Sequence, residues 1–342
     1  MIINSEGKIV GETASFDDVL LQPKYSEIES RSQIDISNYL DEYTYLRLPV
    51  ISSPMDTVTE TNMATAISSS GGLGIIHRYN TIEEQVELAK SVKGHVAVAI
   101  GVTGDYEERA DSLVKAGCRI LCLDVAHGHH LLVRKALKKL RKKFGNKVHL
   151  MAGNVATLEA FNDLADWGAD SIRVGIGGGS ICSTRLNTGH GVPTYQSVVD
   201  CAQSDRSAKL IADGGIKNAG DIVKALAAGA DFVMLGSMLA GTDESPGEIF
   251  TSENKSYKVY RGMASRSAQM EWRGKSSSPE GVSTTIPYKG SVIDILQDIT
   301  GNIKSGFSYS GATSLEILQS KATFIKQTPA GQLESSTHIL RR

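Results

Sequence analysis

A cysteine stands at the rim of a glycine-rich segment, residues 175–193, which reads GIGGGSICSTRLNTGHGVP. Most free cysteines are buried and inert, but Cys182 is followed by the polar residues Ser183 and Thr184. The N–H groups of a glycine run can approach negative charge closely, and a thiolate beside such groups is an activated nucleophile. We therefore predict that Cys182 is catalytic. The other cysteines lie in apolar strand or helix patterns and are predicted to be structural: Cys118, Cys122 and Cys201.

Three glycine-containing segments follow apolar runs in succession: residues 177–180 (GGGS), 213–215 (DGG) and 236–237 (GS). Any one of them is explained by a tight turn. Together they predict a phosphate site, because glycine N–H groups and a following helix N-terminus favour an anion. Asp213 is a carboxylate beside this site, and ribose hydroxyls would satisfy it. The set predicts a nucleoside monophosphate as ligand.

Apolar runs of strand length alternate with helical patterns along the chain. The runs begin near residues 48, 71, 95, 120, 149, 171, 209 and 232. Each has the length and β-branched content of a buried parallel strand. Eight such units are the number that closes a (β/α)8 TIM barrel. The predicted fold is therefore a single α/β domain of this class over residues 1–342, since an open doubly wound sheet would not need eight units so regular.

The longest interval between runs, from residue 171 to residue 209, contains the cysteine loop 175–193. We expect this enlarged loop at the C-terminal face of the barrel, where active sites of this fold lie. A second stretch, residues 260–290, is rich in Ser and Gly and has no clear period, which predicts a lid, a binding loop or disorder. This stretch is called the flap region below. The tail 329–342 is predicted to be mobile unless it docks on a partner subunit.

The composition excludes several classes of partner. The formal net charge of −2 gives no electrostatic basis for binding nucleic acid or a membrane surface. No stretch approaches the roughly 18 apolar residues of a membrane span, and residues 1–12 carry no signal-peptide pattern. The four cysteines do not suggest a disulfide framework in so long a chain. We expect a cytoplasmic globular protein.

With these features assembled, the chain resembles the IMP dehydrogenase/GMP reductase family almost from end to end. The set of matching segments is far more specific than a single glycine motif. They are FDDVLLQPKYS (16–26), SSPMDTVTE (52–60), GGLGIIHR (71–78), LDVAHGH (123–129), AGNVAT (152–157), GIGGGSICSTR (175–185), IADGGIKNAGDIVKALAAGADFVMLGSMLAG (211–241) and YKVYRGM (257–263).

The resemblance implies covalent catalysis, in which Cys182 attacks C2 of a purine 5′-monophosphate and Thr184 and Glu280 assist. Asp124 would meet the nicotinamide ribose of the cofactor, and Arg78 would lie near that cofactor. Contacts to the phosphate, ribose and base of the substrate are implied for a larger set: Ser53, Met55, Gly179, Ser180, Asp213, Gly214, Gly215, Gly236, Ser237, Tyr260, Gly262 and Met263.

The resemblance also implies a potassium ion and a homotetramer. Backbone carbonyls of Gly177, Gly179 and Cys182 would bind the ion. A C-terminal segment of a neighbouring subunit completes this site in the family, and Ser336 stands where that segment has histidine.

The two branches of the family run opposite reactions through one covalent state. The form PEG (279–281) and the N-terminal half resemble dehydrogenases, as does the presence of Ser277 and Pro279 where reductases have Arg and Ser. The tandem regulatory domain of most dehydrogenases, which is inserted near residues 93–94, is missing. The mobile flap is also short: EWRGKSSSP alone separates Met270 from Glu280 and lacks the Arg-Tyr pair whose arginine activates water.

Because hydrolysis needs an activated water, the short flap favours an NADPH-dependent GMP reductase. IMP dehydrogenase with NAD is the alternative, and Arg273 is a conceivable substitute for the missing arginine. A nucleotide sensor without turnover and a flavin-dependent barrel enzyme are further alternatives, although intact Cys182, Thr184 and Glu280 argue against the sensor.

Overall fold

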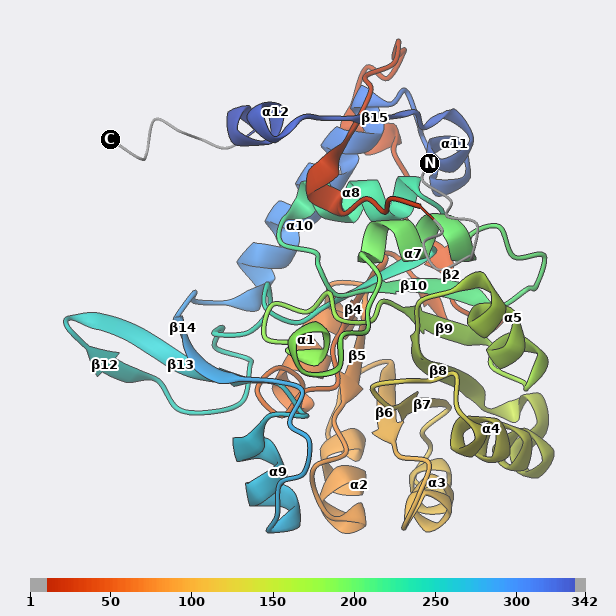
Figure 1. The fold of residues 1–342 in the computed structure, drawn as a ribbon, viewed down its shortest axis with the longest axis vertical. Coiled ribbons are helices and arrows are strands. Elements are labelled where there is room, and N and C mark those ends of the chain that lie inside the picture. Colours follow the sequence, from red (N-terminus) through yellow and green to blue (C-terminus); the bar gives the residue numbers. More distant parts are fainter. Residues whose placement is uncertain (1–10, 336–342) are drawn as a thin grey trace.

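The computed structural model describes residues 11–335. At its centre, eight parallel strands form a closed barrel (Figure 1). Each strand begins within two residues of a predicted apolar run, so the (β/α)8 prediction is confirmed. In chain order the barrel strands are β4 (Val50–Ser52), β5 (Leu73–Ile76), β6 (Val96–Ile100), β7 (Ile120–Asp124), β8 (His149–Val155), β9 (Ser171–Val174), β10 (Lys209–Asp213) and β11 (Phe232–Leu235).

Helices follow the strands and cover the outside of the barrel: α1 (Thr61–Ser69), α2 (Ile82–Lys90), α3 (Tyr106–Lys115), α4 (Leu131–Phe144), α5 (Leu158–Asp166), α7 (Thr194–Cys201), α8 (Ala219–Ala227) and α10 (Val292–Tyr309). Helix α10 packs against both α8 and α1 and so closes the helical ring. Between residues 11 and 335, no helix has the length and apolar character needed to cross a membrane.

Additional elements decorate the barrel. Strands β12 (Phe250–Ser252), β13 (Lys255–Arg261) and β14 (Ser283–Pro287) form an antiparallel sheet that projects to one side (Figure 1). The remaining strands form two small pairs: β1 (Val19–Leu21) with β15 (Phe324–Lys326), and β2 (Asn38–Tyr39) with β3 (Tyr45–Leu46). The remaining helices are α6 (Thr184–Thr188), α9 (Arg266–Arg273), α11 (Leu315–Lys321) and α12 (Pro329–Glu334), with 3-10 turns η1 (Phe16–Asp18), η2 (Arg31–Gln33) and η3 (Gly145–Lys147).

The period of two along each strand divides the core into two clusters. Side chains such as Ile51, Ile75 and Phe232 belong to the cluster that fills the barrel. Their sequence neighbours, such as Val50 and Val233, belong to the larger cluster between strands and helices. Both faces of most strands are therefore apolar, which explains why they read as continuous apolar runs. Strand β9 is an exception, because Ser171 and Arg173 alternate with Ile172 and Val174.

The prediction that the flap region has no regular structure is wrong in part. Residues 260–290 contain the end of β13, helix α9 and strand β14. Signals for α9 are present in the sequence, because the Ser265 side chain accepts the Ala268 N–H as an N-cap and Gly274 ends the helix with φ +67°. Of the tail 329–342, the structure describes α12 and Ser335.

The β2–β3 hairpin closes the N-terminal end of the barrel. Its residues Leu40 and Leu46 join the interior cluster. Asp41 lies 2.9 Å from Nδ1 of the buried His149, although the two are poorly aligned for a hydrogen bond. Burial alone would raise the pKa of Asp41, but the contact with His149 and the amide of Tyr43 lower that pKa to about 2.

We predict that Asp41→Asn destabilises the protein in a pH-dependent way. A carboxyl whose pKa is depressed on folding stabilises the native state above its unfolded pKa of 3.8, and this contribution is lost as the pH falls toward 2. The variant should lose about 1–2 kcal/mol of unfolding free energy at pH 7, and the difference should shrink below pH 4. Urea unfolding of the original protein and of Asp41→Asn, from pH 7 to pH 3, measures this difference in unfolding free energy. An equal difference at every pH would contradict this account.

Candidate active site

A cavity of about 640 Å³ opens where the carboxyl ends of the barrel strands meet. Because parallel strands end at one face, residues far apart in the sequence line this cavity together. Every residue predicted above for catalysis, substrate, cofactor or cation lies in its wall: Ser53, Met55, Arg78, Asp124, Gly177, Gly179, Ser180, Cys182, Thr184, Asp213, Gly214, Gly215, Gly236, Ser237, Tyr260, Gly262, Met263 and Glu280.

Cys182 is the first member of a hydrogen-bonded chain. Its thiol donates to Oγ1 of Thr184 at 3.1 Å, and the Thr184 hydroxyl donates to Oε2 of Glu280 at 2.7 Å. Thr184 can occupy the middle of this chain because a hydroxyl both donates and accepts. A proton leaving the thiol therefore has a direct path to a carboxylate, which is what activation of a cysteine requires.

The loop that carries Glu280 is fixed from two sides by its own backbone. On one side, Glu280 N–H donates to the carbonyl of Ala264 at 3.0 Å. On the other side, the Glu280 carbonyl accepts the N–H of Ser183 at 2.9 Å, next to Cys182 itself. The Pro279 carbonyl accepts the side-chain amide of Asn187 at 2.6 Å. The carboxylate is thus built into the cysteine loop although 96 residues separate it from Thr184.

Glycine is required where the phosphate loops touch. Gly214 has φ +90°, and a Cβ at that position would lie 3.1 Å from the backbone nitrogen of Gly179. A Cβ on Gly178 would lie 2.4 Å from Oγ1 of Thr194. Only bare backbone allows the loops after β9 and β10 to approach this closely. The contact places N–H groups of both loops at one end of the cavity, where an anion would be favoured.

The third glycine segment joins the same end of the cavity. A Cβ on Gly236 would lie 3.2 Å from the Tyr260 hydroxyl and 3.4 Å from Oγ of Ser53. That tyrosine hydroxyl is 3.5 Å from Oγ of Ser180, and burial raises its pKa. The hydroxyl therefore stays protonated near neutral pH and is available as a donor.

Arg173 is a functional residue that the sequence reasoning missed. This side chain lies almost fully buried between Asp124 and Asp213, 2.5 Å and 2.9 Å from their respective carboxylates. Burial would lower the pKa of Arg173, but the two carboxylates raise it well above its ordinary value. Asn154 adds a 2.8 Å donor to Asp213. A charged residue inside the apolar run SIRV was the available signal, since an arginine there must find partners.

Arg78 and Asp124, the two residues predicted to meet the cofactor, both line the cavity. Nε of Arg78 is 3.8 Å from the Asp124 carboxylate and, among residues 11–335, has no hydrogen-bond partner although it is buried. A carboxylate acceptor beside an unpaired guanidinium donor suits a ligand that carries both hydroxyl groups and negative charge. These residues fit a dinucleotide such as NADPH or NAD.

The predicted cation site has carbonyl donors of the right chemistry for potassium, because carbonyl oxygens suit hard cations. One of them is already engaged, since the Gly179 carbonyl accepts the Cys182 N–H at 3.1 Å. Its second lone pair is left for an ion. The residue predicted to depart from the family here, Ser336, lies outside the described residues.

Barrel, glycine loops and partly exposed cysteine together define the class of structure, a (β/α)8 barrel with a candidate active site at the carboxyl ends of its strands. The profile of the IMP dehydrogenase / GMP reductase domain matches residues 13–338, and the chain belongs to that family. It is accordingly a purine-nucleotide oxidoreductase.

Relatives with both activities are similar to this chain. The inosine-5′-monophosphate dehydrogenase of Nitrosopumilus maritimus is 34% identical over 96% of this chain and 98% of its own length. The GMP reductase of Leishmania major is 32% identical over 97% and 98%. A solved structure of a cysteine-to-alanine variant of GMP reductase from Trypanosoma brucei, in complex with guanosine 5′-monophosphate, superposes with a TM-score of 0.93 at 29% identity, covering 98% of this chain and 99% of that one. These similarities do not separate the two activities.

The alignment with the N. maritimus enzyme runs over 468 positions, whereas this chain has 342 residues. That relative therefore contains residues with no counterpart here. In this structure α2 ends at Lys90 and β6 begins at Val96, so only residues 91–95 connect them. The expected absence of a regulatory domain inserted near residues 93–94 is thereby confirmed.

We predict that an alkylating reagent modifies Cys182 alone in the folded protein. Cys182 is partly exposed, whereas the other cysteines are buried, and burial raises the pKa of Cys118 to about 11 and those of Cys122 and Cys201 to about 12. Mass spectrometry after iodoacetamide at pH 7.5 should find one modified thiol per chain, and none in Cys182→Ala. Modification of a second cysteine at a comparable rate would show that this assignment is incorrect.

Replacing Arg173 with Met should cost stability and nucleotide affinity together. The change removes the buried guanidinium that Asp124 and Asp213 share, and loss of one partner of a buried ion pair typically costs about 3–5 kcal/mol. Arg206→Met is the matched control, because Arg206 pairs with Asp166 at the surface and should matter by less than about 1 kcal/mol. Urea unfolding and calorimetric binding of GMP and IMP measure both effects. A variant as stable as the control would refute the structural role of Arg173.

Proposed function

We propose that the chain is an NADPH-dependent GMP reductase, which converts GMP, NADPH and two protons into IMP, NADP+ and ammonium. The observation that carries this proposal is the short segment between Met270 and Glu280. It contains no Arg-Tyr pair, and its end is held by backbone hydrogen bonds on both sides of Glu280. A dehydrogenase must activate a water molecule to hydrolyse its covalent state. A reductase needs a proton source instead, and the Glu280 carboxyl is one.

In the proposed mechanism, the Cys182 sulfur attacks C2 of the purine of GMP and forms a C–S bond. The thiol proton passes through Thr184 to Glu280. Glu280 returns a proton through Thr184 to the departing 2-amino group, which leaves as ammonia and leaves a thioimidate on Cys182. Bound NADPH supplies the hydride that reduces C2. The C–S bond then breaks, its electron pair stays on sulfur, and IMP leaves. The distances of 3.1 and 2.7 Å in the Cys182–Thr184–Glu280 chain support this relay.

The binding roles proposed for the other residues follow their position in the cavity. Gly179, Ser180, Gly214, Gly215, Gly236, Ser237 and Tyr260 hold the 5′-phosphate, Asp213 accepts the ribose hydroxyls, and Ser53, Met55, Gly262 and Met263 surround the base. Asp124 and Arg78 hold the cofactor. The contact of Arg173 with both Asp124 and Asp213 supports this arrangement, because it fixes both carboxylates in the cavity wall, where their oxygens can accept hydroxyl donors.

IMP dehydrogenase is the second candidate, and one observation favours it. Arg273, at the end of α9, lies in the cavity wall. An arginine there is the residue that would take over activation of water if the chain hydrolyses its covalent state.

Two further features belong to the proposal. A potassium ion at the carbonyls of Gly177, Gly179 and Cys182 would stiffen the cysteine loop, and replacing potassium by sodium in the assay tests it.

We also propose a homotetramer. Exposed apolar side chains near the cavity, Leu186 on α6 and Val282 before β14, would then be covered by a neighbour. Light scattering tests the assembly, and a fully active monomer would overturn it.

The decisive experiment follows reduced-nicotinamide absorbance with GMP plus NADPH and with IMP plus NAD. We expect consumption of NADPH and release of ammonia with GMP, and no multiple turnover with IMP. Glu280→Gln should lower the GMP rate by about 100-fold or more, since it keeps the shape but not the acid. Glu248→Gln, at an exposed position, is the matched control. Sustained NADH formation with IMP would replace this proposal by the dehydrogenase.

A further inference from the structure

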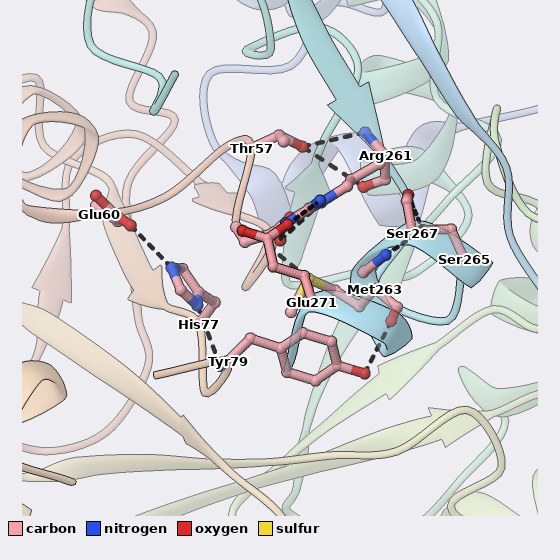
Figure 2. Close-up of polar contacts among 11 residues, drawn as sticks. Thr57, Glu60, His77, Tyr79, Arg261, Met263, Ser265, Ser267 and Glu271 are labelled. Atoms are coloured by element: carbon pink, nitrogen blue, oxygen red, sulfur yellow. Dashed lines mark hydrogen bonds and ion pairs between the residues drawn. The ribbon is translucent and has the colours of Figure 1, made fainter. Parts of the chain in front are cut away.

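Tyr79 contacts one residue proposed to hold the cofactor, Arg78, and one residue proposed to face the base, Met263. It directly follows Arg78 after β5, and both residues line the cavity wall. Its hydroxyl donates to the backbone carbonyl of Met263 at 2.8 Å (Figure 2). Burial raises the pKa of Tyr79, so this hydroxyl remains a donor at neutral pH. Tyr79 is thus bonded to the segment that is proposed to face the purine base, while its neighbour in the chain faces the cofactor.

Met263 has a second hydrogen bond besides this one. Its sulfur accepts the backbone N–H of Asp56 at 3.3 Å. Two residues earlier, Arg261 bridges Asp56 at 2.6 Å and Glu271 of α9 at 2.5 Å (Figure 2). The segment 261–263 is therefore bonded to the loop after β4 through Asp56, and to the loop after β5 through Tyr79.

The ring of Tyr79 contacts helix α9 and Arg78. It stacks on Trp272 of α9, with ring centroids 5.7 Å apart and planes 13° from parallel. The guanidinium of Arg78 lies 5.6 Å from the centre of the same ring. Such a cation–ring contact is weak at a partly exposed site. Arg78 is also only 3.8 Å from Asp124 and has its Nε unpaired within the described chain. A charged ligand on the cofactor side would therefore shift Arg78 at little cost.

We propose that Tyr79 is a positioning residue that couples the cofactor side of the cavity to the base-facing segment at Met263, so that nucleotide and cofactor strengthen each other's binding. The inference rests on the proposed assignment of the two sides to nucleotide and cofactor. A ligand that draws Arg78 from the ring changes the packing of Tyr79, and the hydroxyl transmits this change to the Met263 carbonyl. By thermodynamic linkage, the nucleotide must then change cofactor affinity by the same factor.

Tyr79→Phe isolates this bond, because it keeps the ring and its stack on Trp272 and removes only the hydroxyl. Tyr45→Phe is the matched control: it removes a 2.6 Å hydroxyl bond to Ser37 in the β2–β3 hairpin, at the opposite end of the barrel. The chain has two tryptophans, so a Trp167→Phe background makes Trp272 the fluorescent reporter beside Tyr79.

Dissociation constants are measured by Trp272 fluorescence and calorimetry for GMP with and without saturating NADP+, a pair that cannot turn over. We expect NADP+ to tighten GMP binding at least 5-fold in the background protein and in the Tyr45→Phe control, and less than 2-fold in Tyr79→Phe. The same titration is run with IMP and NAD+ on a Cys182→Ala background, which cannot form the C–S bond and therefore cannot start the reaction. Because only binding is read, coupling seen with IMP and NAD+ alone would overturn the reductase assignment and still support the role of Tyr79.

Two outcomes would overturn the role of Tyr79. The first is an unchanged coupling factor in Tyr79→Phe, whether or not both ligands bind more weakly, which is the result that a merely structural tyrosine would give. The second is no coupling in the background protein with either pair.

Discussion

Arg173 lies at the floor of the cavity, where its guanidinium contacts one carboxylate from β7 and another from β10. Two carboxylates that approach each other in a poorly solvated site repel each other unless a cation lies between them. The buried guanidinium supplies that charge. Its own desolvation is offset because both partners are charged and Asn154 completes the hydrogen bonding of Asp213. The acceptors proposed for the two riboses both depend on this interaction.

Room for Arg173 comes from a residue on the neighbouring strand. A Cβ on Gly153 of β8 would lie 2.5 Å from the Cβ of Arg173, so only glycine is compatible with this packing. The same principle governs the phosphate loops, where glycines allow one backbone to touch another. Glycine at these positions serves close approach, and the resulting gaps are where a ligand's charge can be met by backbone N–H groups.

The flap region is held in place by hydrogen bonds, whereas a mobile lid would lack them. Glu280 is bonded through its backbone to Ala264 and Ser183, and Ser277 N–H donates to the Gln269 side chain of α9 at 2.9 Å. Each bond satisfies a group that a swinging loop would expose to water in turn. These bonds hold the carboxylate beside Thr184 in this structure, an arrangement that suits the proposed proton relay.

The sequence alone determined the barrel and the position of the cysteine loop, and its resemblance to a family predicted many of the residues that line the cavity. Strands with two apolar faces and glycines at their carboxyl ends are local patterns, and local patterns survive without knowledge of distant contacts. It did not reveal α9, whose eight residues depend on the Ser265 cap and on packing against Tyr79. Nor did it reveal the contact of Arg173 with Asp124 and Asp213, or the contact of Tyr79 with Met263. Only the tertiary structure decided these contacts, because they join side chains on β7, β9 and β10, and the loops after β5 and β13, which lie far apart along the chain.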